Sequence, residues 1–170
     1  MRFFAKTFDE LTTHELYEIM RARTAVFVGE QKIVYPDADG LDYQCMHVFA
    51  TDENGRVEAY LRMFRADGLP DAAQFGRVLT VHHGRGTGTQ LMRFAEKTAA
   101  ERLGAEEIRL DAQKTAEGFY RKLGYDAVSD YFIEAGIPPR EDEESPAPGV
   151  IPEWGGAGRF RRAWAVPSRI

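Results

Sequence analysis

A glycine-rich segment between two apolar stretches constrains the fold of this chain more than any other feature. The apolar run "FGRVLTV" (75–81) leads into "HHGRGTG" (82–88), and a second apolar run, "EIRLDAQ" (107–113), follows further along the chain. Between them, apolar residues recur every three or four positions, which indicates an amphipathic helix that starts near Gly88 and ends at Gly104. A strand, a helix and a second strand in this order form a βαβ unit, so the two strands should be parallel neighbours.

The first half of the chain predicts antiparallel strands. "MRFFAKTF" (1–8) is typical of a short strand, and a capping-box spacing at Thr12 predicts that a helix follows it. "MHVFATD" (46–52) and "RVEAYLRMF" (56–64) flank an Asn-Gly pair (54–55), which we expect to supply the positive backbone angles of a tight hairpin turn. Antiparallel strands followed by one parallel βαβ unit predict a mixed α/β sheet flanked by helices.

The remaining segments complete the predicted secondary structure and domain organisation. Residues 66–74, "ADGLPDAAQ", are expected to form a loop, residues 115–124 a helix closed by a glycine, and residues 126–134 a further strand. A composition shift after residue 138 divides the chain into a domain at 1–138, an irregular segment at 139–158 that is acidic and then rich in proline and glycine, and a C-terminal segment at 159–170. The stretch "RFRRAWAV" within the last segment is expected to supply the closing strand of the same domain.

Composition limits the classes of function. A chain of 170 residues with 44% apolar residues is long enough for one domain with its own core. A formal net charge of -5 argues against general nucleic-acid binding, which needs a net basic face. No apolar run has the length of a membrane span and the N-terminus lacks a signal-peptide core, so we expect a cytoplasmic protein.

The metal and disulfide chemistries are also disfavoured by residue counts. The single cysteine, Cys45, has no disulfide partner within the chain and is expected to be a small buried residue. His82 and His83 are adjacent but lack a third ligand nearby in the sequence, so no metal site is predicted.

The glycine-rich loop has the features of an anion cradle. Glycines allow a close backbone approach, and the start of a helix presents unpaired N–H groups. A mononucleotide P-loop requires Lys-Ser/Thr after the last glycine, whereas Gly88 is followed by Thr89 and Gln90. The dinucleotide fingerprint also fits poorly, because Gly84, Gly86 and Gly88 are spaced by two residues throughout. A glycine-rich turn without a ligand remains the alternative.

A second motif favours the anion cradle over a turn without a ligand. The segment "AEGFYRKLGY" (116–125) and the glycine-rich loop together resemble the GNAT superfamily of acyl-CoA-dependent N-acyltransferases. In that family a Gln/Arg-x-x-Gly-x-Gly/Ala loop holds the pyrophosphate of coenzyme A, and an A-x-x-F-Y-x-x-x-G-F/Y helix places a tyrosine near the thioester sulfur. This chain has His83 at the usual Arg/Gln position. The segments "RARTAVFVGEQKIVYPDADGLD", "HVFA", "FGRV", "LDAQ" and "YFIEAGIPP" are similar in sequence and order to the ElaA-like branch of the superfamily.

The resemblance implies an acetyl-CoA-dependent N-acetyltransferase that modifies an amine of a small molecule or a peptide. Tyr120 is implied as the general acid that protonates the leaving thiolate, a role that also suits a phenol protonated at neutral pH. Backbone amides of the loop, more than the His83 side chain, are expected to bind the pyrophosphate. The positions implied in cofactor binding are Val78, Leu79, Thr80, His83, Gly84, Arg85, Gly86, Thr87, Gly88, Thr89 and Phe119.

The general base is less clearly indicated. Glu30 and His47 are candidates, with a loop carboxylate and a half-buried strand residue as their structural alternatives. The acidic group Asp37, Asp39 and Asp42 either attracts a cationic amine or is an exposed polar loop. Two other functional classes stay open, a non-catalytic acyl-CoA-binding module and, less favoured, a mononucleotide-binding protein. The chain is compatible with a monomer or a homodimer.

Overall fold

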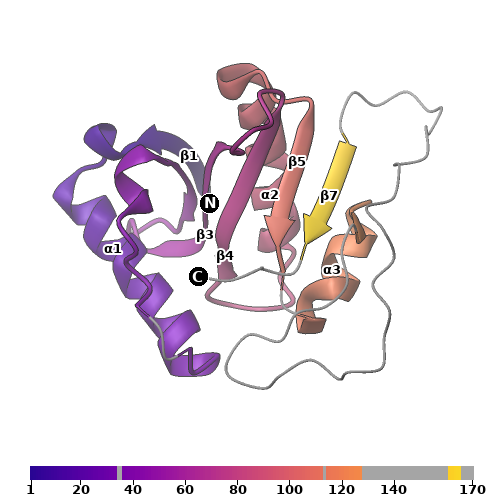
Figure 1. Ribbon diagram of the computed structural model, residues 1–170. Coiled ribbons are helices and arrows are strands. Elements are labelled where there is room, and N and C mark those ends of the chain that lie inside the picture. The colour runs from indigo at the N-terminus through magenta and orange to yellow at the C-terminus, as the bar shows by residue number, and fades with distance from the viewer. Residues whose placement is uncertain (34–35, 113, 128–160, 166–170) are drawn as a thin grey trace.

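A seven-stranded mixed sheet forms the centre of the protein (Figure 1). The computed structural model describes residues 1–33, 36–112, 114–127 and 161–165. The strands are β1 (Arg2–Thr7), β2 (Met46–Thr51), β3 (Val57–Arg65), β4 (Ala72–Thr80), β5 (Glu107–Asp111), β6 (Asp126–Ala127) and β7 (Arg161–Ala165). The α-helices are α1 (Thr13–Arg23), α2 (Thr87–Thr98) and α3 (Glu117–Lys122). Short 3-10 turns lie at Phe8–Glu10, Leu41–Gln44 and Lys114–Ala116, and π-helical turns extend α1 over Thr24–Glu30 and α2 over Ala99–Leu103.

The sheet has the order β1-β2-β3-β4-β5-β7-β6. Strands β1 to β4 pair antiparallel, and β4 pairs parallel with β5. This arrangement confirms the predicted mixed sheet with a βαβ unit around the glycine-rich loop. Strand β7 lies between β5 and β6 and is parallel to both, so the C-terminal segment contributes a strand to this sheet. The predicted segment at 139–158, both of its boundaries and most of the predicted strand at 126–134 lie outside the described residues.

Alternating side chains of the strands build a separate core on each face of the sheet. Val48 of β2 packs in the cluster that contains Leu91 and Met92 of α2, and this confirms the predicted apolar face of that helix. The next residue, Phe49, points to the other face and packs with Ile19 of α1 and Tyr60. In Figure 1, α2 lies behind β4 and β5, whereas α1 lies on the side of the molecule away from β7. Helix α1 thus covers only part of its face of the sheet.

Local signals at the helix ends are confirmed. The Thr12 Oγ1 accepts a hydrogen bond from the N–H of Glu15 at 3.2 Å, and the Glu15 carboxylate accepts one from the N–H of Thr12 at 2.9 Å. This reciprocal pair satisfies two of the N–H groups that a helix start leaves free. Gly104 ends the second helix with a φ of 63°, a left-handed conformation that suits glycine. Cys45 is buried as expected, and burial raises the pKa of its thiol to about 11.

Two local predictions need correction. In the hairpin turn only Gly55 has a positive φ, of 82°, and Asn54 does not, because the Asp52 carboxylate accepts the N–H groups of Asn54 and Arg56 and shapes a wider turn. Strand β4 begins at Ala72 within the predicted loop. The first residues of this strand are alanines, which have a weak strand preference. The ladder hydrogen bonds that they gain by pairing with β5 outweigh this preference.

None of the helices in the described part of the chain combines the length and the apolar character that a bilayer-spanning helix needs.

Candidate active site

Strand β4 continues beyond the part of it that pairs with β5. Their parallel pairing ends at Phe75 and Leu110, but β4 continues to Thr80. The backbone groups of residues 76–80 that face β5 therefore have no strand partner among the described residues. An unpaired strand edge of this kind can accept an extended ligand through main-chain hydrogen bonds.

A β-bulge distorts β4 at the start of this open edge. Tyr60 of β3 pairs with Leu79 and Arg62 pairs with Gly76, so two residues of β4 stand opposite Leu61 alone. One of these two residues, Arg77, has a φ of 55°. Such left-handed conformations of non-glycine residues cost about 1–3 kcal/mol and persist only where the surroundings fix them. The backbone beside the open edge is thus held in an uncommon shape.

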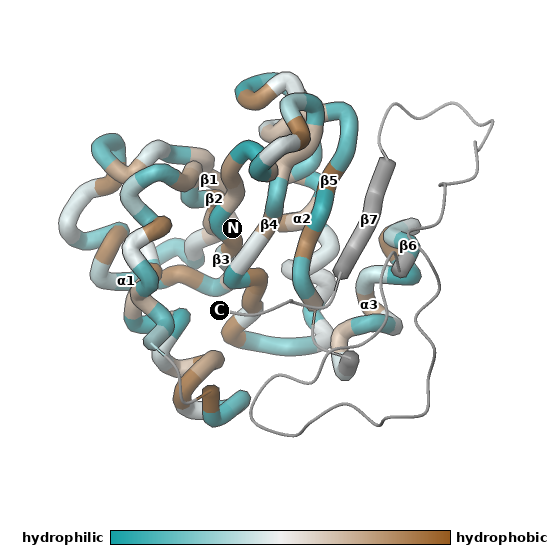
Figure 2. The backbone as a smooth tube through the Cα atoms, viewed as in Figure 1, coloured by the Kyte–Doolittle hydropathy of each residue, from teal (hydrophilic) through white to brown (hydrophobic). Residues whose placement is uncertain are grey.

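The glycine-rich loop connects the end of β4 to α2, and Figure 2 shows it as a hydrophilic stretch. Gly84 and Gly86 have φ values of 76° and 74°, and no heavy atom lies within 4 Å of the position that a Cβ would take at either. Gly86 is the N-cap of α2 and offers no side-chain cap, so the first N–H groups of the helix stay available. The loop therefore leaves open space in front of a helix N-terminus. Thr87, Gly88 and Thr89 form the first turn of the helix, and Arg85 is exposed directly before it.

Gly88 has a different role from the two preceding glycines. A Cβ at this position would lie 3.3 Å from both the Phe119 Cζ and the Thr80 Cγ2. The lack of a side chain thus lets α2 approach α3 and the end of β4 closely. The contact brings two motifs that are distant in the sequence, the glycine-rich loop and the Phe-Tyr pair of α3, to one place.

Tyr120 lies on the same face of the sheet as α2. Its ring makes edge contacts with Phe119 and Tyr125, at centroid distances of 5.1 and 5.8 Å, and the residue is 4% exposed. Burial raises the pKa of the Tyr120 phenol above its ordinary value, so this group stays protonated at physiological pH. The neighbouring hydroxyl of Tyr125 donates a hydrogen bond to the Glu96 carboxylate at 2.9 Å.

Glu30 and His83 meet at the start of the glycine-rich loop. Their side chains are 3.1 Å apart between Oε2 and Nε2, and the other ring nitrogen of His83 lies 3.3 Å from the Thr80 hydroxyl. Both side chains are exposed to solvent, to 49% for Glu30 and 69% for His83. The structure therefore groups a predicted base, a predicted loop residue and the last residue of β4. His82 points elsewhere and pairs with Glu58.

The surroundings of His47 favour a structural role over that of the general base. It is 1% exposed, its Nδ1 lies 2.9 Å from the Tyr60 hydroxyl and its Nε2 lies 3.0 Å from the backbone carbonyl oxygen of Asp42. Burial lowers the pKa of this imidazole. In addition, the whole of β3 separates β2 from the open edge of β4. With both nitrogens engaged inside the protein, His47 ties the 41–44 turn to the sheet.

The aspartates at 37, 39 and 42 do not form an acidic patch. Each one accepts hydrogen bonds from two arginines, so that six ion pairs close into a ring of alternating charges. In order around this arginine–aspartate ring, the members are Asp37, Arg23, Asp42, Arg62, Asp39 and Arg77. The three arginines balance the charge of the three carboxylates, so the ring offers no excess negative charge to a cationic amine.

The sequence interpretation overlooked the three arginines of this ring. A signal for two of them exists, because Arg62 and Arg77 interrupt the apolar strands "AYLRMF" and "FGRVLT". A charged residue in a half-buried strand requires a partner of opposite charge. The identity of that partner is not readable from sequence spacing, since the paired residues are up to 40 positions apart.

The ring predicts an acid-sensitive fold. Hydrogen bonds from Arg62 hold the pKa of the Asp39 carboxyl well below its usual range. A carboxyl with a lowered folded-state pKa stabilises the fold above its ordinary pKa near 4, and this contribution is lost as the pH falls below that value. We expect Asp39→Asn to unfold more easily than the parent at pH 7, with a difference that shrinks as the pH falls from about 4 to about 2. Urea unfolding midpoints measured from neutral pH down through this window test it. Asp67→Asn is the control, because exposed Asp67 makes no ion pair with the described residues; equal pH profiles for all three proteins would contradict the prediction.

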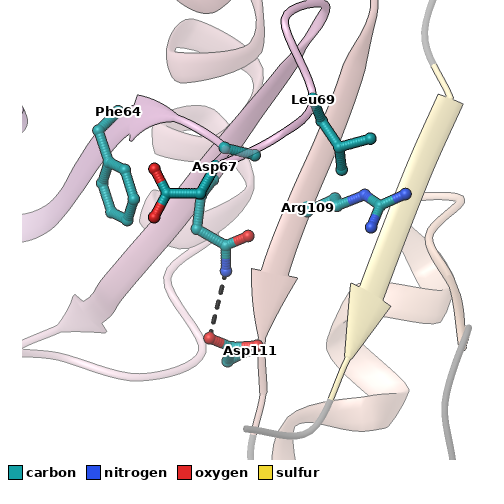
Figure 3. Close-up of a pocket in the computed structure, with 7 residues that line it drawn as sticks. Phe64, Asp67, Leu69, Arg109 and Asp111 are labelled. Carbon is teal, nitrogen blue, oxygen red and sulfur yellow. Dashed lines mark hydrogen bonds between the residues drawn. The ribbon is translucent and has the colours of Figure 1, made fainter. Parts of the chain in front are cut away.

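A hollow of about 290 Å³ lies elsewhere, on the face of the sheet opposite α2 (Figure 3). Figure 3 shows Phe64 and Asp67 on one side of it and Asp111 of β5 beside it, whereas the Arg109 side chain extends from β5 in the direction of β7. The Gln74 amide donates to Asp111 at 3.2 Å. Much of its lining comes from the β3–β4 connection, at the end of β4 away from the glycine-rich loop. It is therefore distinct from the place where the loop, the open edge and α3 meet.

Comparison with known proteins agrees with this geometry. A family model described as an acetyltransferase (GNAT) domain matches residues 37–139, more than half of the chain. The chain belongs to the GNAT acetyltransferase family. A UPF0039 protein of Schizosaccharomyces pombe is 35% identical over 144 residues, which cover 81% of this chain and 93% of that protein.

Solved structures support the same assignment for the fold. The crystal structure of Escherichia coli ElaA has a TM-score of 0.72 at 29% identity and covers 79% of this chain and 93% of the ElaA chain. An acyl-CoA N-acyltransferase from Pseudomonas aeruginosa has a TM-score of 0.69 at 33% identity, with 79% and 92% of the two chains covered. The resemblance to the ElaA-like branch and the predicted GNAT fold are thereby confirmed.

Proposed function

We propose that this GNAT family member transfers an acetyl group from acetyl-CoA to an amine of a small molecule or a peptide. The observation that carries the proposal is the meeting of three features at the C-terminal end of β4: the open strand edge, the free N-terminus of α2 and the Phe119–Tyr120 pair of α3. Bound acetyl-CoA would supply an activated thioester at this place.

The glycine-rich loop fits the pyrophosphate of coenzyme A. Two left-handed glycines with open space around them let the backbone approach a phosphate, and the uncapped N–H groups of α2 favour negative charge. The backbone of Val78, Leu79 and Thr80 along the open edge would bind the extended pantetheine by main-chain hydrogen bonds.

Tyr120 suits the role of general acid. Its phenol would donate a proton to the sulfur as the C–S bond breaks, and would then be reprotonated from solvent. Burial raises the pKa of this phenol, which weakens it as an acid. A coenzyme A sulfur enclosed beside this phenol would be desolvated in the same way, which raises the pKa of a thiol too. The proton affinities of donor and acceptor would then rise together, and the transfer would stay within the range of general acid catalysis.

Glu30 is the base that we propose for the amine. Its carboxylate is half-exposed and is held by His83, which also lies beside Thr80 at the end of the open edge. The carboxylate would accept the proton that the amine nitrogen loses when it attacks the thioester carbonyl.

Coenzyme A should raise the melting temperature of the parent, because a ligand that binds only the folded state stabilises that state. ATP at the same concentration should do much less, since it lacks the pantetheine arm. Gly86→Val should abolish the coenzyme A effect, because valine would place a side chain in the cradle and disfavour a φ of 74°. Thermal unfolding with and without each ligand measures this.

Gly68→Val is the matched control. Gly68 has a φ of 72° and equally open space around it, but it lies in the β3–β4 connection at the other end of β4. It should lose stability as Gly86→Val does and keep the full response to coenzyme A. Equal stabilisation by ATP and coenzyme A, or loss of the response in both variants, would refute the cradle.

A further inference from the structure

We propose that the arginine–aspartate ring sets the shape of the β4 bulge, and that Arg77 is thereby a positioning residue for acyl transfer. The inference rests on the proposed function, because it assigns the bulge to the edge where the thioester would bind. Arg77 would act through the backbone of β4, and its side chain would touch neither substrate.

Arg77 is the only member of the ring that belongs to β4. Its Nε donates to the Asp37 carboxylate at 2.7 Å, and its Nη2 donates to the Asp37 carbonyl and to the Asp39 carboxylate, at 3.2 Å in each case. These contacts hold the side chain of the residue whose φ is positive. The loop at 37–42 thus binds the side chain of a β4 residue that belongs to the bulge.

The rest of the ring is anchored in the core. Arg23 of α1 is completely buried and donates to the carboxylates of Asp37 and Asp42. Arg62 of β3 is 4% exposed and donates to Asp39 and Asp42. Because α1 and β3 are packed elements, the ring ties the bulge to rigid parts of the fold rather than to a free loop.

The contacts between the ring and the bulge matter for function because of where the bulge lies. The two bulge residues, Arg77 and Val78, lie within residues 76–80 of β4, which have no strand partner on the β5 side among the described residues. Displacing a binding group by about 1 Å can lower a reaction rate about a hundredfold, even when the displaced group does not react. The ring, which lies outside the glycine-rich loop and the 116–125 motif, would therefore control how the β4 backbone meets the thioester.

Arg77→Gly distinguishes the effect of the Arg77 side chain from that of the positive φ at this position. Glycine accepts a positive φ, so the bulge remains sterically allowed while the ring loses its contact with β4. We expect kcat at saturating acetyl-CoA to fall at least about tenfold, with the Kd for coenzyme A changed less than about threefold, because the glycine-rich loop is intact. Hydrogen exchange of the peptide that contains residues 76–80 should become faster. Arg77→Lys, which keeps the charge but fewer donors, should lie between the two proteins and serves as the test if Arg77→Gly does not fold.

Lys6→Gln is the control for the loss of an ion pair elsewhere in the fold. Lys6 and Glu15 form a half-buried ion pair at 2.8 Å that does not touch β4, and its loss should leave kcat and the exchange of 76–80 unchanged. Parent values of kcat and exchange in Arg77→Gly would overturn the inference, as would a loss of kcat in both variants in step with their melting temperatures. If the parent transfers no acetyl group, the proposed function fails separately, and the exchange measurement alone decides whether the ring holds the bulge.

Discussion

Tyr120→Phe is expected to lower the turnover of acetyl transfer by about a hundredfold to ten-thousandfold, the usual cost of losing a general acid. The substitution keeps the ring that packs between Phe119 and Tyr125 and deletes only the hydroxyl. Binding of acetyl-CoA should barely change, because the glycine-rich loop and the open edge of β4 are intact. Turnover with the best amine from a panel, the Kd for acetyl-CoA and the melting temperature should be measured for both proteins.

Tyr125→Phe is the matched control for this experiment. It also removes a buried tyrosine hydroxyl near the end of α3, one that donates to Glu96. It should lose stability and keep turnover within a few-fold of the parent. A Tyr120→Phe enzyme with turnover close to the parent's would remove Tyr120 as the acid. Tight acetyl-CoA binding with no acetylation by either protein would favour a non-catalytic binding module.

Arg23→Met is expected to destabilise the fold by about 3–5 kcal/mol, the range for removing one partner of a buried ion pair. Arg23 is completely buried, and its loss leaves Asp37 and Asp42 with one arginine each in place of two. For a domain of this size, such a loss lowers the melting temperature by roughly 6–20 °C. Urea unfolding of the parent and the variant measures the free energy directly.

Two further proteins test the cause of that loss. Lys6→Gln, which removes a more exposed ion pair, should cost less than about 1 kcal/mol. The double variant Arg23→Met/Asp42→Asn should lose less free energy of unfolding than the two single variants lose together, because it leaves fewer uncompensated charges in the core. A cost for Arg23→Met no greater than that of Lys6→Gln would show that the ring contributes little to stability.

Features that rest on local physics are predictable from the amino-acid sequence. The capping box at Thr12, the apolar face of α2 and the left-handed glycine at Gly104 depend on residues within a few positions of one another. Strand, glycine-rich loop, helix and strand then leave few possible topologies, since parallel neighbours need a crossover connection. For this reason the mixed sheet was predictable from the sequence. The family resemblance came instead from the glycine-rich loop and the 116–125 motif.

The contacts between residues far apart in the chain depend on the tertiary fold and were not predictable. The aspartates at 37, 39 and 42 become parts of a neutral ring because α1, β3 and β4 bring three arginines to them. His47 becomes a buried link between β2 and the 41–44 turn, and the bulge at Arg77 arises from the register of β3 against β4. Each of these outcomes depends on packing between segments far apart in the chain, and the free energy of a buried charge depends on which partner the fold places beside it.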